Sequence, residues 1–360
     1  MKRVLLMTNQ LFRWSGSETV LVELAEELSQ AGVAVSIFAN VLDTNFMRDV
    51  IGNRVSVISD PSKVRLEDFD IIYCQHQVLT VFLDQLLELE NAQKTPRIVY
   101  GHLSPFNRLE FPGPSIEKHF ADYSICNSAE TLSKMIDLGL DQGKLQLFPN
   151  PAPSSFFNIS APIGTPKKLL AVSNHFPTEI KKALKKIERA GVQVTRRGRQ
   201  FTSSRVTAEE LQSHDMVLTI GKTVQYALAA QRPVYVYDRF GGPGWLSETN
   251  FRAAEENNFS GRCVNTKKSP DAISKEIING RHLAVEALGD LQRFREKFRL
   301  EKYVQELFLS KDSSKYKMDD FDDIPQSKRD AFKDEYNSYI RFIRKNNRGM
   351  KFSLRSLLPF

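Results

Sequence analysis

The stretch VLLMTNQLFRWSGSETVLVELAEELSQAGVAVSIF, residues 4–38, decides the fold class. Its first four residues form a short apolar run bounded by polar residues, which predicts a buried strand. Apolar residues then recur at helical spacing from Val20 to Leu28, and Gly32 is a typical helix end. Residues 33–38 predict the next strand. A strand, a helix and a strand in succession form a βαβ unit, which implies a parallel sheet.

Strands and helices continue to alternate on both sides of a linker, Asn150–Pro151–Ala152–Pro153. Before the linker, the pattern predicts strands at 55–58, 71–74, 97–100, 123–126 and 145–148, and helices at 78–89 and 128–138. After it, strands are expected at 169–172, 192–195, 216–220 and 234–237, and helices at 177–190 and 223–230. The chain then looks helical from 273 to 309, and a final amphipathic helix is expected at 327–345.

This alternation predicts an α/β protein with two Rossmann-like, doubly wound parallel-sheet domains and a C-terminal helical extension. We expect the domains at residues 1–160 and 161–280 and the extension at 281–360. The length of 360 residues agrees with two domains and an appendage. Two such domains in tandem are expected to bind a ligand at the carboxyl ends of their strands.

The composition excludes a disordered or fibrous chain, because 41% of the residues are hydrophobic and 26% are charged, as in globular proteins. Fifty Lys and Arg residues against 43 Asp and Glu residues give a net charge of +7. This mild excess suits an anionic small molecule or an anionic membrane surface. We expect no nucleic-acid partner, because duplex binding usually requires a concentrated basic face.

The cysteines and the lengths of the apolar runs indicate where in the cell the protein is located. Cys74, Cys126 and Cys263 are far apart and have no C-x-x-C spacing, so neither a disulfide framework nor a structural zinc site is expected. The apolar run near Met1 is too short for a signal peptide, and no run reaches the roughly 18–20 residues of a membrane span. We expect a cytoplasmic protein, at most peripheral on the inner face of the membrane.

The strongest candidate binding segment covers residues 215–229, where an apolar strand leads into Gly221–Lys222–Thr223 and a helix. Backbone N–H groups, a hydroxyl and an ammonium group would converge there, as in a phosphate site. A P-loop would need glycine at the position of Met216, which argues against a nucleoside triphosphatase. An ordinary helix start with a surface lysine is the alternative.

Three further segments are candidates. Gly16 precedes the first helix, where the backbone can approach an anion; a helix start with Ser17 as N-cap is the alternative. The glycine-rich segment 238–245 predicts a loop closed around a ligand, with Trp245 stacked on a base or sugar, or else a turn covered by an aromatic side chain. Arg262 ends a polar segment and could bind a phosphate.

Histidines follow two of the predicted strands. His102 comes after strand 97–100, and His175 holds the matching place in the second domain. Because ligands bind at the carboxyl ends of parallel strands, both are candidates, with a structural histidine as the alternative. His76 also ends a strand, but further metal ligands are not spaced nearby. No metal site is expected.

Three stretches resemble glycosyltransferases with the GT-B fold, especially the large retaining family four and bacterial surface-polysaccharide enzymes. They are SGSETVLVELAEELSQAGVAVSIFAN (15–40), YSICNSAETLSKMIDLGLDQGKLQLFPNPAPSSFF (123–157), and the region from Val206 to Arg262 with GKTVQYALAAQRPVYVYDRFGGPGWL and NNFSGR. The resemblance covers roughly residues 1 to 300 and implies transfer of a sugar, with retention, from a nucleotide-sugar donor to a glycan or lipid-linked acceptor in capsule or lipopolysaccharide synthesis. It implies no cofactor and no metal.

The resemblance also implies roles for the candidates. His102 and Gly16 would be the catalytic residues, with His102 facing the donor sugar or the acceptor hydroxyl. The donor would be bound by Asn174, His175, Gly221, Lys222, Thr223, Tyr237, Asp238, Gly241, Gly242 and Arg262. The chain departs from the family-four pattern, since Tyr226 stands where an acid is expected and Asn174 and His175 replace an Arg–Lys pair. A non-hydrolysing sugar-nucleotide epimerase and a non-catalytic partner subunit therefore remain alternatives.

The C-terminal tail predicts a further interaction. Phe332, Tyr336, Tyr339, Ile340 and Ile343 fall on one face of the final helix, and six basic residues without an acidic one lie between Arg341 and Arg355. A basic stretch with apolar anchors is typical of peripheral attachment to an anionic membrane. The alternative is that the apolar stripe packs on a protein domain and the basic end is solvated.

Overall fold

The structure is a computed structural model, and it describes residues 1–43, 46, 55–89, 95–113, 115–198, 201, 204–310 and 325–346. The chain divides into two compact units. Unit 1 comprises Met1–Asn127, Thr131–Leu147 and Val304–Phe360, and unit 2 comprises Ser128–Glu130 and Phe148–Tyr303. The predicted boundaries at 160 and 280 differ from these, because the helices up to residue 303 stay with unit 2 while the final helix packs in the core of unit 1.

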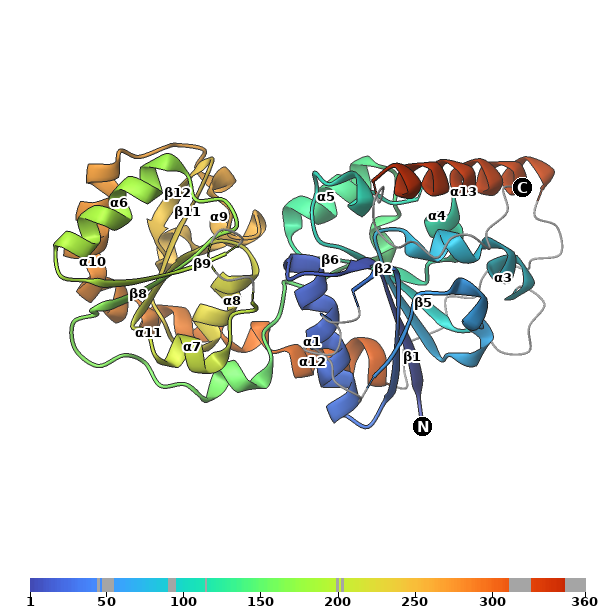
Figure 1. Cartoon of the computed structure of the whole chain (residues 1–360), viewed down its shortest axis with the longest axis horizontal. Helices are drawn as coiled ribbons and strands as arrows, with labels where there is room; N and C mark the ends of the chain where they lie inside the picture. Colours follow the sequence, from blue (N-terminus) through green and yellow to red (C-terminus); the bar gives the residue numbers. More distant parts are fainter. Residues whose placement is uncertain are drawn as a thin grey trace. The chain divides into compact units, whose positions relative to one another are not determined.

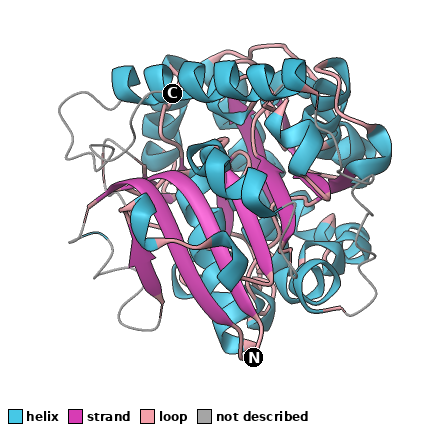
Figure 2. Ribbon diagram, turned by 90° about the vertical axis from the view of Figure 1, so that its right-hand side faces the viewer, coloured by secondary structure: helices cyan, strands magenta, loops and turns pink. Residues whose placement is uncertain are grey.

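Unit 1 is built on a parallel seven-stranded sheet with the order β3-β2-β1-β4-β5-β6-β7. The strands are β1 (Arg3–Leu11), β2 (Ala34–Leu42), β3 (Ser56–Ile58), β4 (Ile71–Gln75), β5 (Arg97–His102), β6 (Tyr123–Cys126) and β7 (Leu145–Leu147). The helices are α1 (Gly16–Gln30), α3 (Leu83–Glu88), α4 (Ile116–Phe120), α5 (Ala129–Asp137), whose first two residues group with unit 2, and α13 (Gln326–Asn346). Helices cover both faces of the sheet (Figure 2). The strand order reverses between β1 and β4, which is where open α/β sheets bind ligands.

The final helix, α13, belongs to the core of unit 1 (Figure 1). Its apolar stripe, from Phe332 to Ile343, is buried, and the Phe332 ring lies 5.5 Å from that of Phe120. The predicted stripe therefore packs on a protein domain, as in the alternative interpretation. The basic residues from Arg348 onward lie outside the described residues, so the predicted tail attachment is not tested by the fold.

Unit 2 contains a five-stranded sheet with the order β12-β11-β10-β8-β9. Its strands are β8 (Lys168–Val172), β9 (Gln193–Arg197), β10 (Met216–Thr219), β11 (Val234–Asp238) and β12 (Gly241–Trp245), of which β12 runs antiparallel to β11. Its helices are α6 (Thr178–Arg189), α7 (Ala208–Gln212), α8 (Lys222–Ala229), α9 (Glu248–Glu256), α10 (Pro270–Glu286) and α11 (Leu288–Leu291), followed by α12 (Leu300–Val304) at the junction. The predicted doubly wound architecture is confirmed for both units.

The glycine-rich segment 241–245 is a strand, so its interpretation as a loop around a ligand is wrong. A side chain at Gly241 would collide with the carbonyl oxygen of Thr266, and one at Gly242 with that of Val236. The indole N–H of Trp245 donates to the Glu276 carbonyl oxygen at 3.0 Å, and the ring packs edge-on against Tyr235. Close backbone packing therefore explains these glycines.

Among the described helices, none has an apolar stretch long enough to cross a membrane.

Candidate active site

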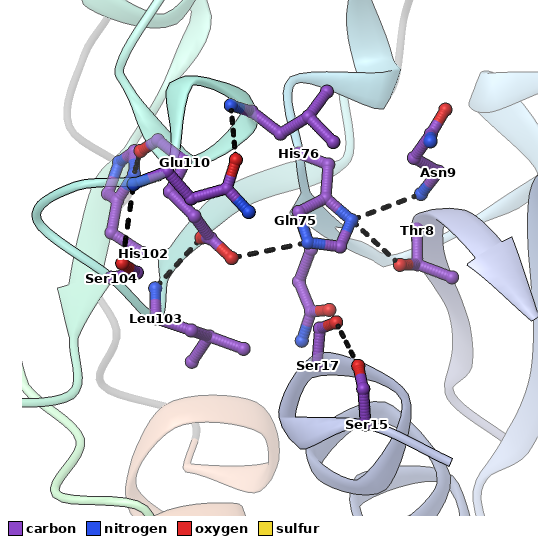
Figure 3. A network of polar contacts seen from close by, with 12 residues as sticks. Thr8, Asn9, Ser15, Ser17, Gln75, His76, His102, Leu103, Ser104 and Glu110 are labelled. Atoms are coloured by element: carbon purple, nitrogen blue, oxygen red, sulfur yellow. Dashed lines mark hydrogen bonds and ion pairs between the residues drawn. The ribbon is translucent and has the colours of Figure 1, made fainter. Parts of the chain in front are cut away.

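Polar side chains gather at the carboxyl ends of β1, β4 and β5 in unit 1. Thr8 and Asn9 lie in β1, His76 follows β4, and His102 ends β5. Glu110 joins them from the loop after β5, although it is far from His76 in the sequence. Figure 3 shows His76 between Thr8 and Asn9 on one side and Glu110 on the other. All five side chains are buried, so their polar atoms depend on one another or on a ligand.

The imidazole of His76 is held at both nitrogen atoms. Nδ1 lies 3.1 Å from Thr8 Oγ1 and accepts the backbone N–H of Asn9 at 3.3 Å. Nε2 lies 3.2 Å from Glu110 Oε1. Because a backbone N–H only donates, the neutral ring carries its proton on Nε2 and donates it to Glu110. Nδ1 is therefore the unprotonated nitrogen that a general base requires, and its lone pair is directed at the Asn9 N–H and the Thr8 hydroxyl.

The backbone at this strand end is strained. His76 and Gln77 are consecutive non-glycine residues in the left-handed region, with φ of 58° and 56°. Each such conformation costs about 1–3 kcal/mol and persists where the surroundings enforce it. Burial lowers the pKa of His76, but the carboxylates of Glu110 and Glu18 outweigh this effect and raise it above the ordinary value. A raised pKa strengthens the imidazole as a base.

His102, the predicted catalytic residue, contacts protein groups at both ring nitrogens. Its Nε2 lies 2.7 Å from Glu117 Oε1, and its Nδ1 lies 2.5 Å from the Glu110 carbonyl oxygen. Burial lowers the pKa of His102, but the Glu117 carboxylate outweighs burial and raises it. The bond from its Nδ1 to the Glu110 carbonyl oxygen means that His102 helps to position Glu110. The predicted role of His102 stays a prediction, and His76 is a second histidine at the same sheet edge.

Helix α1 begins at Gly16, which is exposed and would have open space around an added side chain. The N-cap is Ser15, rather than the expected Ser17, and it makes no side-chain capping bond. The buried carboxylate of Glu18 instead accepts hydrogen bonds from Ser15 Oγ, from Ser17 Oγ at 2.9 Å and from Gln10 Nε2 at 3.0 Å. A buried carboxylate beside this helix start favours a hydroxyl-bearing ligand over a phosphate.

In unit 2, the predicted phosphate segment opens α8 as expected. Gly221 is the N-cap, with φ of 57°, and no side chain caps the helix. Lys222 Nζ donates to the Pro151 carbonyl oxygen at 2.8 Å and lies 5.1 Å from the centre of the Tyr226 ring. Thr223 is half-buried in the first turn. The first-turn N–H groups of α8 thus meet the electrostatic requirement of an anion site.

The remaining predicted donor residues fall into two groups. Asn174 and His175 are exposed just after β8, whose end is tied to that of β10 by a bond from Thr219 Oγ1 to the Val172 carbonyl oxygen at 3.1 Å. They therefore share a sheet edge with Gly221. Tyr237, Gly241 and Gly242 are buried in local packing.

Asp238 and Arg262 organise the segment that follows β12. Asp238 Oδ2 accepts bonds from Ser260 Oγ at 2.6 Å and the Gly261 N–H at 3.1 Å, which fixes the turn before Arg262. The Arg262 guanidinium donates to Ser260 Oγ at 2.8 Å and to Glu130, which groups with unit 2. Arg262 would have to exchange these partners to bind a phosphate. In the parts of the chain that the structure describes, no cluster of side chains could hold a metal ion.

The comparisons with known proteins agree with this architecture. Neither a protein-family model nor a curated protein matches the sequence. The crystal structure of Anabaena Alr3699/HepE in complex with UDP covers 85% of this chain and 98% of its own, with a TM-score of 0.54 and 14% identity. The structure of Acinetobacter baumannii MurG covers 85% and 99%, with a TM-score of 0.51 and 10% identity. The chain has the GT-B fold. The sequence resemblance is thereby confirmed at the level of the GT-B fold.

Proposed function

We propose that the protein is a glycosyltransferase that moves a sugar from a nucleotide-sugar donor to a hydroxyl of a glycan or lipid-linked acceptor in bacterial surface-polysaccharide synthesis. The observation that carries the proposal is the buried His76–Glu110 pair at the carboxyl edge of a GT-B unit. A glycosyl acceptor is a hydroxyl that must lose its proton as the new bond forms. A histidine oriented by a carboxylate is suited to take that proton.

Unit 2 is proposed to bind the donor. The uncapped start of α8 and the ammonium of Lys222 would stabilise the negative charge that develops on the departing nucleotide phosphate. Asn174 and His175 lie at the neighbouring strand end and would contact the nucleotide sugar. UDP is bound in the HepE structure, which supports a uridine nucleotide as the first donor to test. No step in this scheme requires a metal ion.

Unit 1 is proposed to bind the acceptor. The acceptor hydroxyl would take the place of both Thr8 Oγ1 and the Asn9 N–H as the partner of His76 Nδ1. The amide oxygen of Gln75, which is fully buried beside His76, has no hydrogen-bond partner among the described residues. A ligand hydroxyl would supply the missing donor. The buried carboxylates of Glu18, Glu110 and Glu117 make this edge a poor site for a phosphate.

The stereochemical outcome follows from the role of His76. Retention, which the sequence resemblance implies, would leave His76 to orient the acceptor. Direct deprotonation of the acceptor by His76 in a single displacement would invert the anomeric centre. NMR spectroscopy of the product's anomeric proton distinguishes the two outcomes.

The test is nucleotide release from a panel of nucleotide sugars, measured with and without candidate acceptors such as lipid-linked saccharides. A transferase releases nucleotide in proportion to added acceptor. Conversion of the donor sugar without an acceptor would identify an epimerase instead. A protein that binds nucleotide but changes no substrate would be a partner subunit, and the proposal would then be wrong.

A variant pair tests the site itself. His76→Ala should lower turnover by about 10²–10⁴-fold with little change in donor affinity, because the base acts on the acceptor in the transition state. His282→Ala is the matched control, since His282 is exposed on α10. Equal turnover of both variants would exclude His76 from catalysis.

A further inference from the structure

Besides the C-terminal tail, one other short segment of the chain is strongly basic. Residues 163–198 contain nine Lys and Arg residues and two acidic residues. The remainder of the chain contains 41 of each, so its formal charge is zero. Unit 2 therefore contains a local excess of seven positive charges, equal to the net charge of the whole chain.

Helix α6 carries most of this charge on one face. Its inner face is apolar and buried against β8 and α10, through Ile180, Ala183, Leu184 and Ile187. Figure 1 shows α6 beside α10 at the surface of unit 2. The outer face holds five exposed basic residues, which we call the α6 strip: Lys181, Lys182, Lys185, Lys186 and Arg189. The strip runs from Lys181 to Arg189, roughly 12 Å or just over two turns of helix.

Unit 2 neutralises little of the α6 strip. Lys186 Nζ contacts Asp271 Oδ1 at 2.6 Å, but both side chains are exposed, so the pair is screened by solvent. Within the described part of the chain, the other four residues form no ion pair. Lys181 and Lys185, and likewise Lys185 and Arg189, are four residues apart on the helix, where like charges repel. The α6 strip is therefore a positively charged surface, and an anionic partner would reduce the repulsion between its charges.

We propose that the α6 strip docks unit 2 on an anionic lipid bilayer. Four of the five charges are lysine ammonium groups. The strip has no aromatic side chain that could stack on a nucleotide base, which argues against a nucleic-acid partner. Near the N-terminal end of α6, Phe201 is 51% exposed, and its ring packs edge-on, 6.0 Å from that of Phe176. Basic residues beside an exposed apolar side chain match the interface of a charged membrane.

The test is sedimentation of the full-length protein with vesicles of phosphatidylglycerol and phosphatidylcholine, and with phosphatidylcholine alone. The wild type should bind only the anionic vesicles, and high salt should weaken binding. The variant Lys181→Gln/Lys182→Gln/Lys185→Gln should bind roughly 100-fold more weakly, since each charge near the surface changes the partition coefficient about fivefold. Phe201→Ser should further reduce the binding that survives at high salt.

The matched control removes the same charge from unit 1. Lys328, Arg341 and Lys345 are exposed on α13, and their triple glutamine variant should bind anionic vesicles like the wild type. If the two triple variants lose vesicle binding equally, only the net charge of the protein matters. If the α6 variant binds vesicles like the wild type, the contact lies elsewhere, for example in the tail. Either result overturns the proposal, as does tight binding to a single-stranded RNA without vesicle binding. Unchanged circular dichroism melting ensures that the variants are folded. The assay needs no sugar donor, so its outcome is independent of the proposed transferase activity.

Discussion

A single backbone N–H group, that of Asn9, determines how His76 is protonated in its neutral form. It donates to Nδ1, so the proton resides on Nε2 and points to Glu110. The neighbouring His102 is equally buried, but its two nitrogens bond to Glu117 and to the Glu110 carbonyl oxygen. Two histidines at one sheet edge therefore have different partners: the ring of His76 lies against the Thr8 hydroxyl, whereas the ring of His102 lies against a carboxylate and a carbonyl oxygen.

Glu110→Gln should lower the pKa of His76, because it removes the carboxylate that raises it. The folded pKa of His76 lies above its unfolded value, so the protonated pair stabilises the fold fully below the unfolded pKa. This contribution is lost as the pH rises through the folded pKa. NMR titration of the histidine rings measures the shift, and urea unfolding at several pH values measures the stability. Glu88→Gln, at an exposed position, is the control; an unchanged His76 titration in Glu110→Gln would contradict the pairing.

At the scale of elements, α13 completes a neighbouring helix. Glu335 Oε2 accepts the N–H groups of Ser115 and Ile116 at 2.7 and 3.1 Å, and thereby caps α4. Helix α4 carries Glu117, which holds His102. The C-terminal helix is thus connected through buried hydrogen bonds to the residues around Glu110, and its removal should disturb the site as well as the core.

Glu335→Ala should lower the free energy of unfolding by about 1–3 kcal/mol, because two N–H groups lose their acceptor. Burial raises the pKa of Glu335, so its charge costs stability once the pH exceeds that pKa. Glu335→Gln retains an acceptor oxygen without the charge, and should therefore gain stability relative to the wild type as the pH rises. Chemical unfolding across pH measures both effects. A similar loss in Asp334→Asn, the exposed neighbour, would show that the cap is not responsible.

At the scale of the molecule, each unit has its own hydrophobic core. Phe82 belongs to the core of unit 1 and Phe251 to one of the cores of unit 2. We expect calorimetry to show two thermal transitions, with Phe82→Ala and Phe251→Ala each lowering a different one. UDP at 100 times its dissociation constant should stabilise only the transition that Phe251→Ala lowers, by about 2.7 kcal/mol. Stabilisation of the other transition would move the donor site to unit 1.

Much of the fold could be predicted from the sequence, because it depends on local patterns. The βαβ alternation, the linker near Asn150 and the stripe of α13 all follow from periodicity and from turn residues. The segment 241–245 was misjudged, because glycines that allow backbones to pack closely look like glycines that surround a ligand. The start of α8 was located correctly, since a glycine before a helix is a local signal.

By itself, the sequence determined two α/β units and the strand ends at which polar side chains gather. Only the tertiary structure decided which side chains meet there. Glu110 reaches His76 across 34 positions of sequence, and Glu335 reaches Ile116 across 219. Such pairs produce no periodic pattern in the amino-acid sequence, because hydrogen bonds between distant segments depend on how strands and helices pack. Local sequence patterns therefore predicted the edge of the sheet, while tertiary packing decided that Glu110 lies against the ring of His76 and Glu117 against that of His102.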